Sequence, residues 1–113
     1  MHEPVKWPCI FGCLAKDEIR HYLVCPVLWQ PASEKLGSEV SILVGERLCL
    51  IEPSVLKLRM IALCHFIYHS CKHDDVCASG MTHFCTNSGV APPWPVVQNR
   101  AIGFAKVGYH LVQ

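Results

Sequence analysis

Two closely spaced pairs of metal-binding residues near the N-terminus constrain the fold of this chain more than any other feature. Cys9 and Cys13 flank a short turn that contains Gly12, and His21 and Cys25 follow after seven intervening residues. Structural zinc takes four nitrogen or sulfur ligands at tetrahedral corners. A tight turn brings two thiolates together, and residues at i and i+4 of a helix project from one face. The spacing therefore predicts a structural zinc site held by Cys9, Cys13, His21 and Cys25.

The eight cysteines of the chain allow three interpretations: disulfides, metal ligands, or buried thiols that act as small hydrophobic residues. The N-terminus shows no apolar run typical of a secretory signal, so nothing indicates an oxidising compartment. If three cysteines bind zinc, five remain, and an odd number cannot pair completely within one chain. The alternative to the zinc site is that the cysteines are buried thiols and His21 is a polar surface residue.

Length and composition favour a single folded domain. The chain has 113 residues, of which 51% are hydrophobic and 17% charged, and this excludes a disordered charged tail. The formal net charge of +1 gives no overall signature of a nucleic-acid-binding protein. Arg59 and His65 interrupt the densest apolar run, so we expect an intracellular protein without a membrane-spanning segment.

Apolar periodicity and helix-capping residues predict a mostly α-helical fold. Ser54 is the predicted N-cap of the strongest helix, which runs to about Lys72, and residues 95–111 form a second long helix. Two shorter helices are predicted before them, one beginning at Asp17 and Glu18 and ending near Cys25, the other ending at Gly37. Residues 40–44 resemble a strand and residues 46–50 a helical turn, so the connection between these helices is ambiguous. The fold class expected is a small zinc-stabilised turn-helix module packed on a core of two longer helices.

We divide the chain into a zinc-binding module with short helices at residues 1–37 and a helical region at residues 38–113. Turn-forming residues at 80, 87–89 and 92–93 predict a long loop at about 74–93 within the second region. A loop of this length in a small domain is usually functional, ordered by a ligand, or disordered.

Further cysteines and histidines suggest two other metal sites. Five residues around the predicted loop could form a second zinc site that orders it: Cys71, His73, Cys77, His83 and Cys85. His65, His69 and His73 recur at helical spacing with Asp74 and Asp75 next to them, a geometry that can bind a transition metal. A metal-dependent hydrolase that uses His65, His69 and Asp74 is therefore a distant alternative. The simpler interpretation of this histidine stripe is a solvent-facing or interfacial surface.

The segment from Cys9-Ile-Phe-Gly-Cys13 through Lys16-Asp-Glu-Ile-Arg-His-Tyr-Leu-Val-Cys-Pro-Val-Leu-Trp29 resembles a known zinc-binding segment. The similarity is to the C-terminal end of the reverse transcriptases of non-LTR (LINE-like) retroelements. There a cysteine pair is followed by an acidic helix start, a histidine, Cys-Pro and a tryptophan. The resemblance covers about residues 7–29. It implies that Cys9, Cys13, His21 and Cys25 are CCHC-like zinc ligands, with Glu18, Leu23, Pro26 and Trp29 as the supporting frame.

The resemblance implies that the chain is a fragment or remnant of such an element and that it helps to engage nucleic acid. No polymerase or nuclease motif is present, so we expect this chain not to be an enzyme, although a parent polyprotein would carry the reverse transcriptase. RNA or DNA contacts are expected from four basic and aromatic residues, Lys6, Trp7, Lys16 and Arg20, because single-stranded bases stack on aromatic rings. The alternative function is a zinc-stabilised protein-protein interaction module, with a protein partner or self-association through the apolar long helix.

Overall fold

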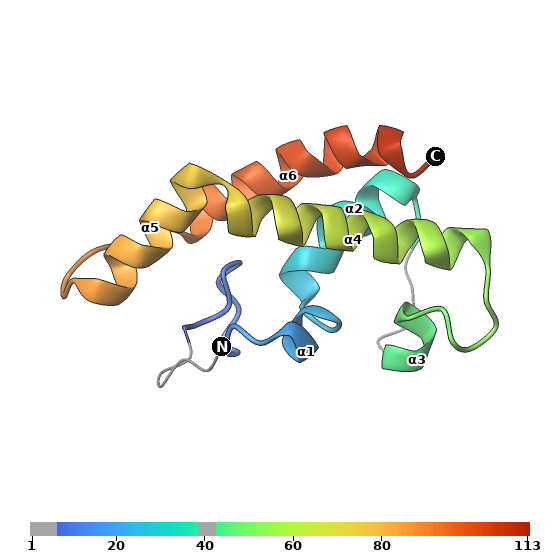
Figure 1. The fold of residues 1–113 in the computed structure, drawn as a ribbon, viewed down its shortest axis with the longest axis horizontal. Coiled ribbons are helices and arrows are strands. Elements are labelled where there is room, and N and C mark those ends of the chain that lie inside the picture. The colour runs from blue at the N-terminus through green and yellow to red at the C-terminus, as the bar shows by residue number, and fades with distance from the viewer. Residues whose placement is uncertain (1–6, 39–42) are drawn as a thin grey trace.

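The chain is almost entirely helical. The computed structural model describes residues 7–38 and 43–113, and these residues form six α-helices and no β-strand (Figure 1). The helices are α1 (Ile19–Tyr22), α2 (Pro26–Leu36), α3 (Val44–Arg47), α4 (Val55–His73), α5 (Asp75–Thr86) and α6 (Trp94–Leu111). The mostly helical class predicted from the sequence is therefore confirmed.

Helix α4 forms where its cap and its apolar stripe predict it. The Ser54 hydroxyl accepts a hydrogen bond from the Lys57 backbone N–H at 3.1 Å, which satisfies one of the unpaired donors of the first turn. One face of the helix is buried from its second turn onward, at Met60, Leu63, Cys64, Ile67 and Cys71. This periodic burial fixes which side of α4 faces the core.

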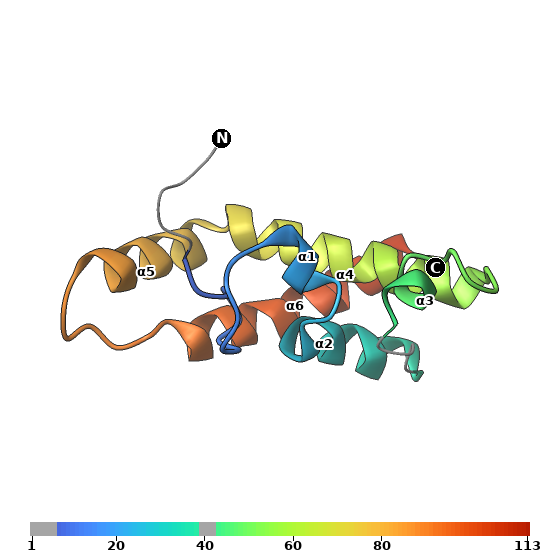
Figure 2. The same cartoon turned by 90° about the horizontal axis from the view of Figure 1, so that it is seen from below.

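Helices α2, α4 and α6 pack against one another in pairs and form the core (Figures 1 and 2). Small residues let α6 approach α4 closely: Ala101 and Ala105 are buried, and a Cβ on Gly108 would lie 2.8 Å from Leu63 Cδ1. Helix α2 ends at Gly37, whose left-handed backbone (φ 66°) stops the helix as predicted. The core thus contains the two predicted long helices and adds α2 to them.

The prediction of a loop at residues 74–93 is wrong for residues 75–86, which form helix α5. Asp74 caps this helix by accepting a hydrogen bond from the Cys77 backbone N–H at 3.0 Å. Cys77 and Met81, four residues apart, are both buried, so α5 has an apolar side. The small and polar residues between them hide this side in the sequence.

Between α2 and α4, the sequence allows either a strand or a helical turn, and the structure shows a helical turn. Residues 44–47 form the single helical turn α3, and the strand-like residues 40–42 lie outside the described residues. In the part of the chain that is described, no helix has the length and apolar character needed to cross a membrane.

Candidate metal centre

A tight turn between two short extended segments presents the first two cysteines. Pro8 and Lys16 pair in an antiparallel bridge, and the Cys9 backbone N–H donates to the Ala15 carbonyl at 2.9 Å. The Gly12 N–H closes the turn onto the Cys9 carbonyl at 3.1 Å, with a φ of 89° that favours glycine. The turn therefore places the Cys9 and Cys13 side chains on the same side of the segment.

The second pair of ligands comes from a helix junction, which differs from the prediction. The spacing predicts His21 and Cys25 on one face of a single helix, but α1 ends at Tyr22 and Cys25 is the N-cap of α2. Pro26 at the first position of α2 explains the break, since proline lacks the N–H that would continue α1. The two residues still meet because the chain turns back at residues 23–24.

The four predicted ligands converge. Their ligand atoms, the sulfurs of Cys9, Cys13 and Cys25 and a ring nitrogen of His21, all lie within 4.8 Å of one another. The Cys25 sulfur lies 3.7 Å from that of Cys9 and 3.8 Å from that of Cys13. A tetrahedral zinc ion with Zn–S bonds of about 2.3 Å holds two sulfurs about 3.8 Å apart. These two edges of the cluster therefore already have the dimension that zinc requires.

Hydrogen bonds within the cluster control its protonation. The thiol of Cys25 lowers the pKa of Cys9 to about 5 by hydrogen bonding, whereas the same contact raises the pKa of Cys25. Burial raises the pKa of Cys13, whose sulfur lies 2.8 Å from His21 Nε2. The Phe11 backbone N–H donates to the Cys9 sulfur at 3.4 Å, a contact typical of metal-bound thiolates.

Tyr22 and Asp17 connect the cluster to α4. The Tyr22 hydroxyl donates to Asp17 and accepts from the Ile10 backbone N–H at 3.2 Å. Asp17 also forms an ion pair with Lys72 of α4, with 2.7 Å between Oδ2 and Nζ. The Tyr22 ring lies against Tyr68 of the same helix, with ring centroids 4.4 Å apart. This network joins the turn, α1 and α4 into one unit.

Helix α6 holds the turn from the other side. The Gln98 side-chain amide donates to the Phe11 carbonyl at 2.7 Å. Gly12 lies so close to Trp94 that a Cβ there would be 2.7 Å from the Trp94 Cγ. In Figure 2 the blue segment that precedes α1 lies across the bundle between α4 and α6, in agreement with these contacts. The sequence indicates a turn at Gly12 but offers no sign that Trp94 is its partner.

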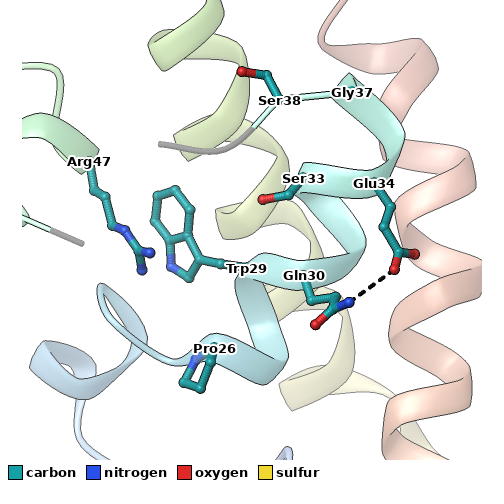
Figure 3. A pocket seen from close by; sticks show the side chains of 8 residues that line it. All are labelled: Pro26, Trp29, Gln30, Ser33, Glu34, Gly37, Ser38 and Arg47. Carbon is teal, nitrogen blue, oxygen red and sulfur yellow. Dashed lines mark hydrogen bonds between the residues drawn. The ribbon is translucent and has the colours of Figure 1, made fainter. Parts of the chain in front are cut away.

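An open groove of about 650 Å³ lies beside the centre, where Pro26 follows Cys25 (Figure 3). The Arg47 guanidinium stands 4.3 Å from the Trp29 ring centroid and donates to the Leu23 carbonyl at 2.9 Å. Trp29 is buried and donates through Nε1 to the Tyr22 carbonyl at 2.9 Å. Tyr22 and Trp29 therefore pack the small core next to the candidate ligands.

The other predicted site residues do not gather into a second cluster. Among residues 7–38 and 43–113, only the four N-terminal ligands bring three or more metal-binding side chains together. Cys71 and Cys77 are buried, which raises their pKa values to about 12 and about 11, whereas His73 and His83 are exposed. In the structure the five residues of the predicted second zinc site, Cys71, His73, Cys77, His83 and Cys85, are not brought together: Cys71 and Cys77 are buried neighbours, whereas the two histidines face solvent.

The hydrolase alternative also lacks its cluster. Both oxygens of Asp74 have partners at the junction of α4 and α5, namely the Cys77 N–H at 3.0 Å and Arg100 at 3.2 Å. His65 and His69 are exposed on α4 and form no three-residue group with this carboxylate.

Three of the four predicted nucleic-acid contacts fall within the described residues. Lys16 and Arg20 are exposed, and Arg20 lies 3.8 Å from Glu18. Trp7 is half-buried against the core, and Lys6 lies outside the described residues.

Comparison with known proteins gives no relative: no protein-family model, curated protein or solved structure matches this chain.

Proposed function

We propose that the chain is a non-catalytic zinc-binding module and that, as its resemblance implies, it is the nucleic-acid-contacting tail of a retroelement reverse transcriptase. The observation that carries the proposal is the convergence of four ligand atoms within 4.8 Å. Four protein ligands fill a tetrahedral zinc site and leave no position for a reacting water, so the metal would be structural. Zinc would supply the order that the turn and a four-residue helix cannot obtain alone.

The zinc step is tested by elemental analysis of the purified chain. One zinc per chain is expected in the parent protein, and Cys25→Ser should lose it on dialysis against a weak chelator. Cys49→Ser is the matched control, because Cys49 is a thiol outside the cluster. A folded parent chain that contains no zinc would exclude the site.

The nucleic-acid step is supported by the exposure of Lys16 and Arg20 beside the centre. The double variant Lys16→Ala, Arg20→Ala should bind single-stranded RNA more weakly. The slope of log binding constant against log salt concentration should become less negative by about 1.4, the value for two lost phosphate contacts. Filter binding across a salt series measures this, with Lys106→Ala on α6 as the control. RNA binding that is unchanged in the double variant would place the contacts elsewhere.

A second candidate function, a zinc-stabilised protein-interaction module, is favoured by one observation. Half of the large hydrophobic side chains exposed in the described part lie in one stretch, residues 43–58: Leu43, Val44, Leu48, Leu50, Ile51, Val55 and Leu58. An apolar surface of this kind usually marks an interface. Self-association through the start of α4 is the form that can be tested with this chain alone. Sedimentation velocity should then show a dimer for the parent and a monomer for Leu58→Glu, with Leu111→Glu as the control.

A further inference from the structure

Three histidines form a continuous ladder on the solvent-facing side of α4. His65, His69 and His73 are all exposed and follow one another at intervals of four residues. At about 100° per residue, His69 lies half a turn away from the buried stripe centred on Ile67 and Cys71. The ladder is therefore open to solvent along its length and separate from the cysteine cluster.

The rings of the ladder lie close enough to share a ligand. The ring centroids of His65 and His69 are 5.8 Å apart with nearly parallel planes, and those of His69 and His73 are 4.4 Å apart. A metal ion bound at about 2.0–2.1 Å to two imidazole nitrogens brings those nitrogens to roughly 3.3 Å of each other. Two histidines at i and i+4 on one helix face are the arrangement that zinc peptidases use for this purpose. His69, the central residue, can pair in either direction, and His73 is its closer neighbour.

The charges around His73 favour a cation. His73 is the last residue of α4, where the unpaired carbonyls carry the negative end of the helix dipole. The exposed Asp75 follows two residues later. The nearest lysine on the helix, Lys72, directs its ammonium group 2.7 Å from Asp17, toward the cysteine centre.

From this geometry we infer a second metal site, a surface site for a late first-row divalent cation held by His69 together with His73. Imidazole pairs bind these cations in the order Co²⁺, Ni²⁺, Cu²⁺ of increasing affinity. Water fills the remaining coordination positions, so the ion exchanges readily, unlike one enclosed by four protein ligands. Phe66 and Ser70 follow His65 and His69, where the peptidase pattern carries the glutamate that acts as general base, so the proposal is for metal binding only. This inference is independent of the function proposed above.

The test uses the zinc-loaded, tag-free chain and Ni²⁺ as the probe. Isothermal titration should show one Ni²⁺ bound per chain, while elemental analysis shows the original zinc retained. His69→Ala should weaken Ni²⁺ binding by about tenfold or more, because a single imidazole cannot chelate. His73→Ala should have a larger effect than His65→Ala, and His110→Ala, an exposed histidine on α6, should have none.

A second measurement locates the ion. Paramagnetic Ni²⁺ should broaden the backbone amide signals of residues 65–75 and leave those of residues 9–25 sharp. Parent-like Ni²⁺ affinity in His69→Ala, or broadening centred on residues 9–25, would overturn the inference. So would the absence of Ni²⁺ binding to the parent chain. His69 is exposed, so its replacement should leave the helical circular dichroism unchanged and the comparison valid.

Discussion

Gly12 lies directly against the indole of Trp94, so that a Cβ built on Gly12 would stand 2.7 Å from the Trp94 Cγ. The contact joins the turn between the first two cysteines to the first residue of α6. Together with the hydrogen bond from Gln98 to Phe11, it links the candidate metal centre to this helix. The turn cannot shift away from Trp94 without moving the two cysteine ligands that flank it.

We therefore expect Gly12→Ala to destabilise the protein by about 2–4 kcal/mol. About 1–2 kcal/mol comes from placing a side chain at a φ of 89°, and the remainder from overpacking against the indole. Urea unfolding followed by tryptophan fluorescence measures the loss. Gly89→Ala is the matched control, because its φ is 78° and nothing lies within 4 Å of the added Cβ. Equal losses in the two variants would show that the contact with Trp94 contributes nothing.

Removal of the metal should disorder the N-terminal segment before the helical core. Helix α1 has only four residues and cannot persist alone, whereas α4 and α6 bury apolar faces against each other. Hydrogen exchange on chelator-treated protein should show fast exchange at residues 9–22 and retained protection at Leu63 and Ile67. Protection at residues 9–22 that survives metal removal would mean that packing alone orders the segment.

The sequence was sufficient for the parts of the fold that depend on local signals. Ser54 and the buried stripe of α4 are visible in the sequence because capping and helical periodicity involve neighbouring residues. The four candidate ligands were identifiable for the same reason, since each pair is close in the chain. The backbone that carries the second pair could not be predicted in the same way, because Pro26 breaks the helix expected to carry both His21 and Cys25.

The remaining features depend on contacts between distant residues. The partners of the turn, Trp94 and Gln98, are more than 80 residues away, and Phe11 and Gln98 are 87 residues apart. Helix α5 was missed because its glycine, serine and threonine residues are weak helix formers. Besides the Asp74 cap, tertiary contacts stabilise this helix: Phe84 packs edge-on against Trp94 with ring centroids 5.3 Å apart, and Gly80 allows Pro93 to approach.

Loss of the Asp17 carboxylate should weaken the attachment of the metal centre to α4. Asp17→Asn removes the ion pair with Lys72 and weakens the hydrogen bond from Tyr22, so we expect a loss of about 1–2 kcal/mol after solvent screening. A double-mutant cycle with Lys72→Met gives the coupling between the two residues. Glu18→Gln is the control, since its partner Arg20 is 87% exposed and 3.8 Å away. Additive effects of Asp17→Asn and Lys72→Met would contradict a coupling across this pair.

Asp74 should contribute stability that depends on pH, because it caps α5 and pairs with Arg100. The Cys77 backbone N–H and the Arg100 guanidinium lower the pKa of the Asp74 carboxyl below its usual value. Between the folded pKa and the unfolded value of about 3.9, the unfolded chain binds more protons. The stabilisation is therefore complete above about pH 5 and is lost as the pH falls through the folded pKa.

Two substitutions separate the cap from the charge. Asp74→Ala removes both and should cost about 1 kcal/mol at pH 7, whereas Asp74→Asn keeps an oxygen that can accept from Cys77. The difference in free energy of unfolding between the parent and Asp74→Asn should be positive at pH 7 and should shrink below about pH 5, with most of the loss below the unfolded value of about 3.9. Urea unfolding in zinc-containing buffer at each pH measures it, with both proteins in the same metal state. A difference that stays constant from pH 7 down to pH 3 would show that the charge of Asp74 is not what stabilises the junction of α4 and α5.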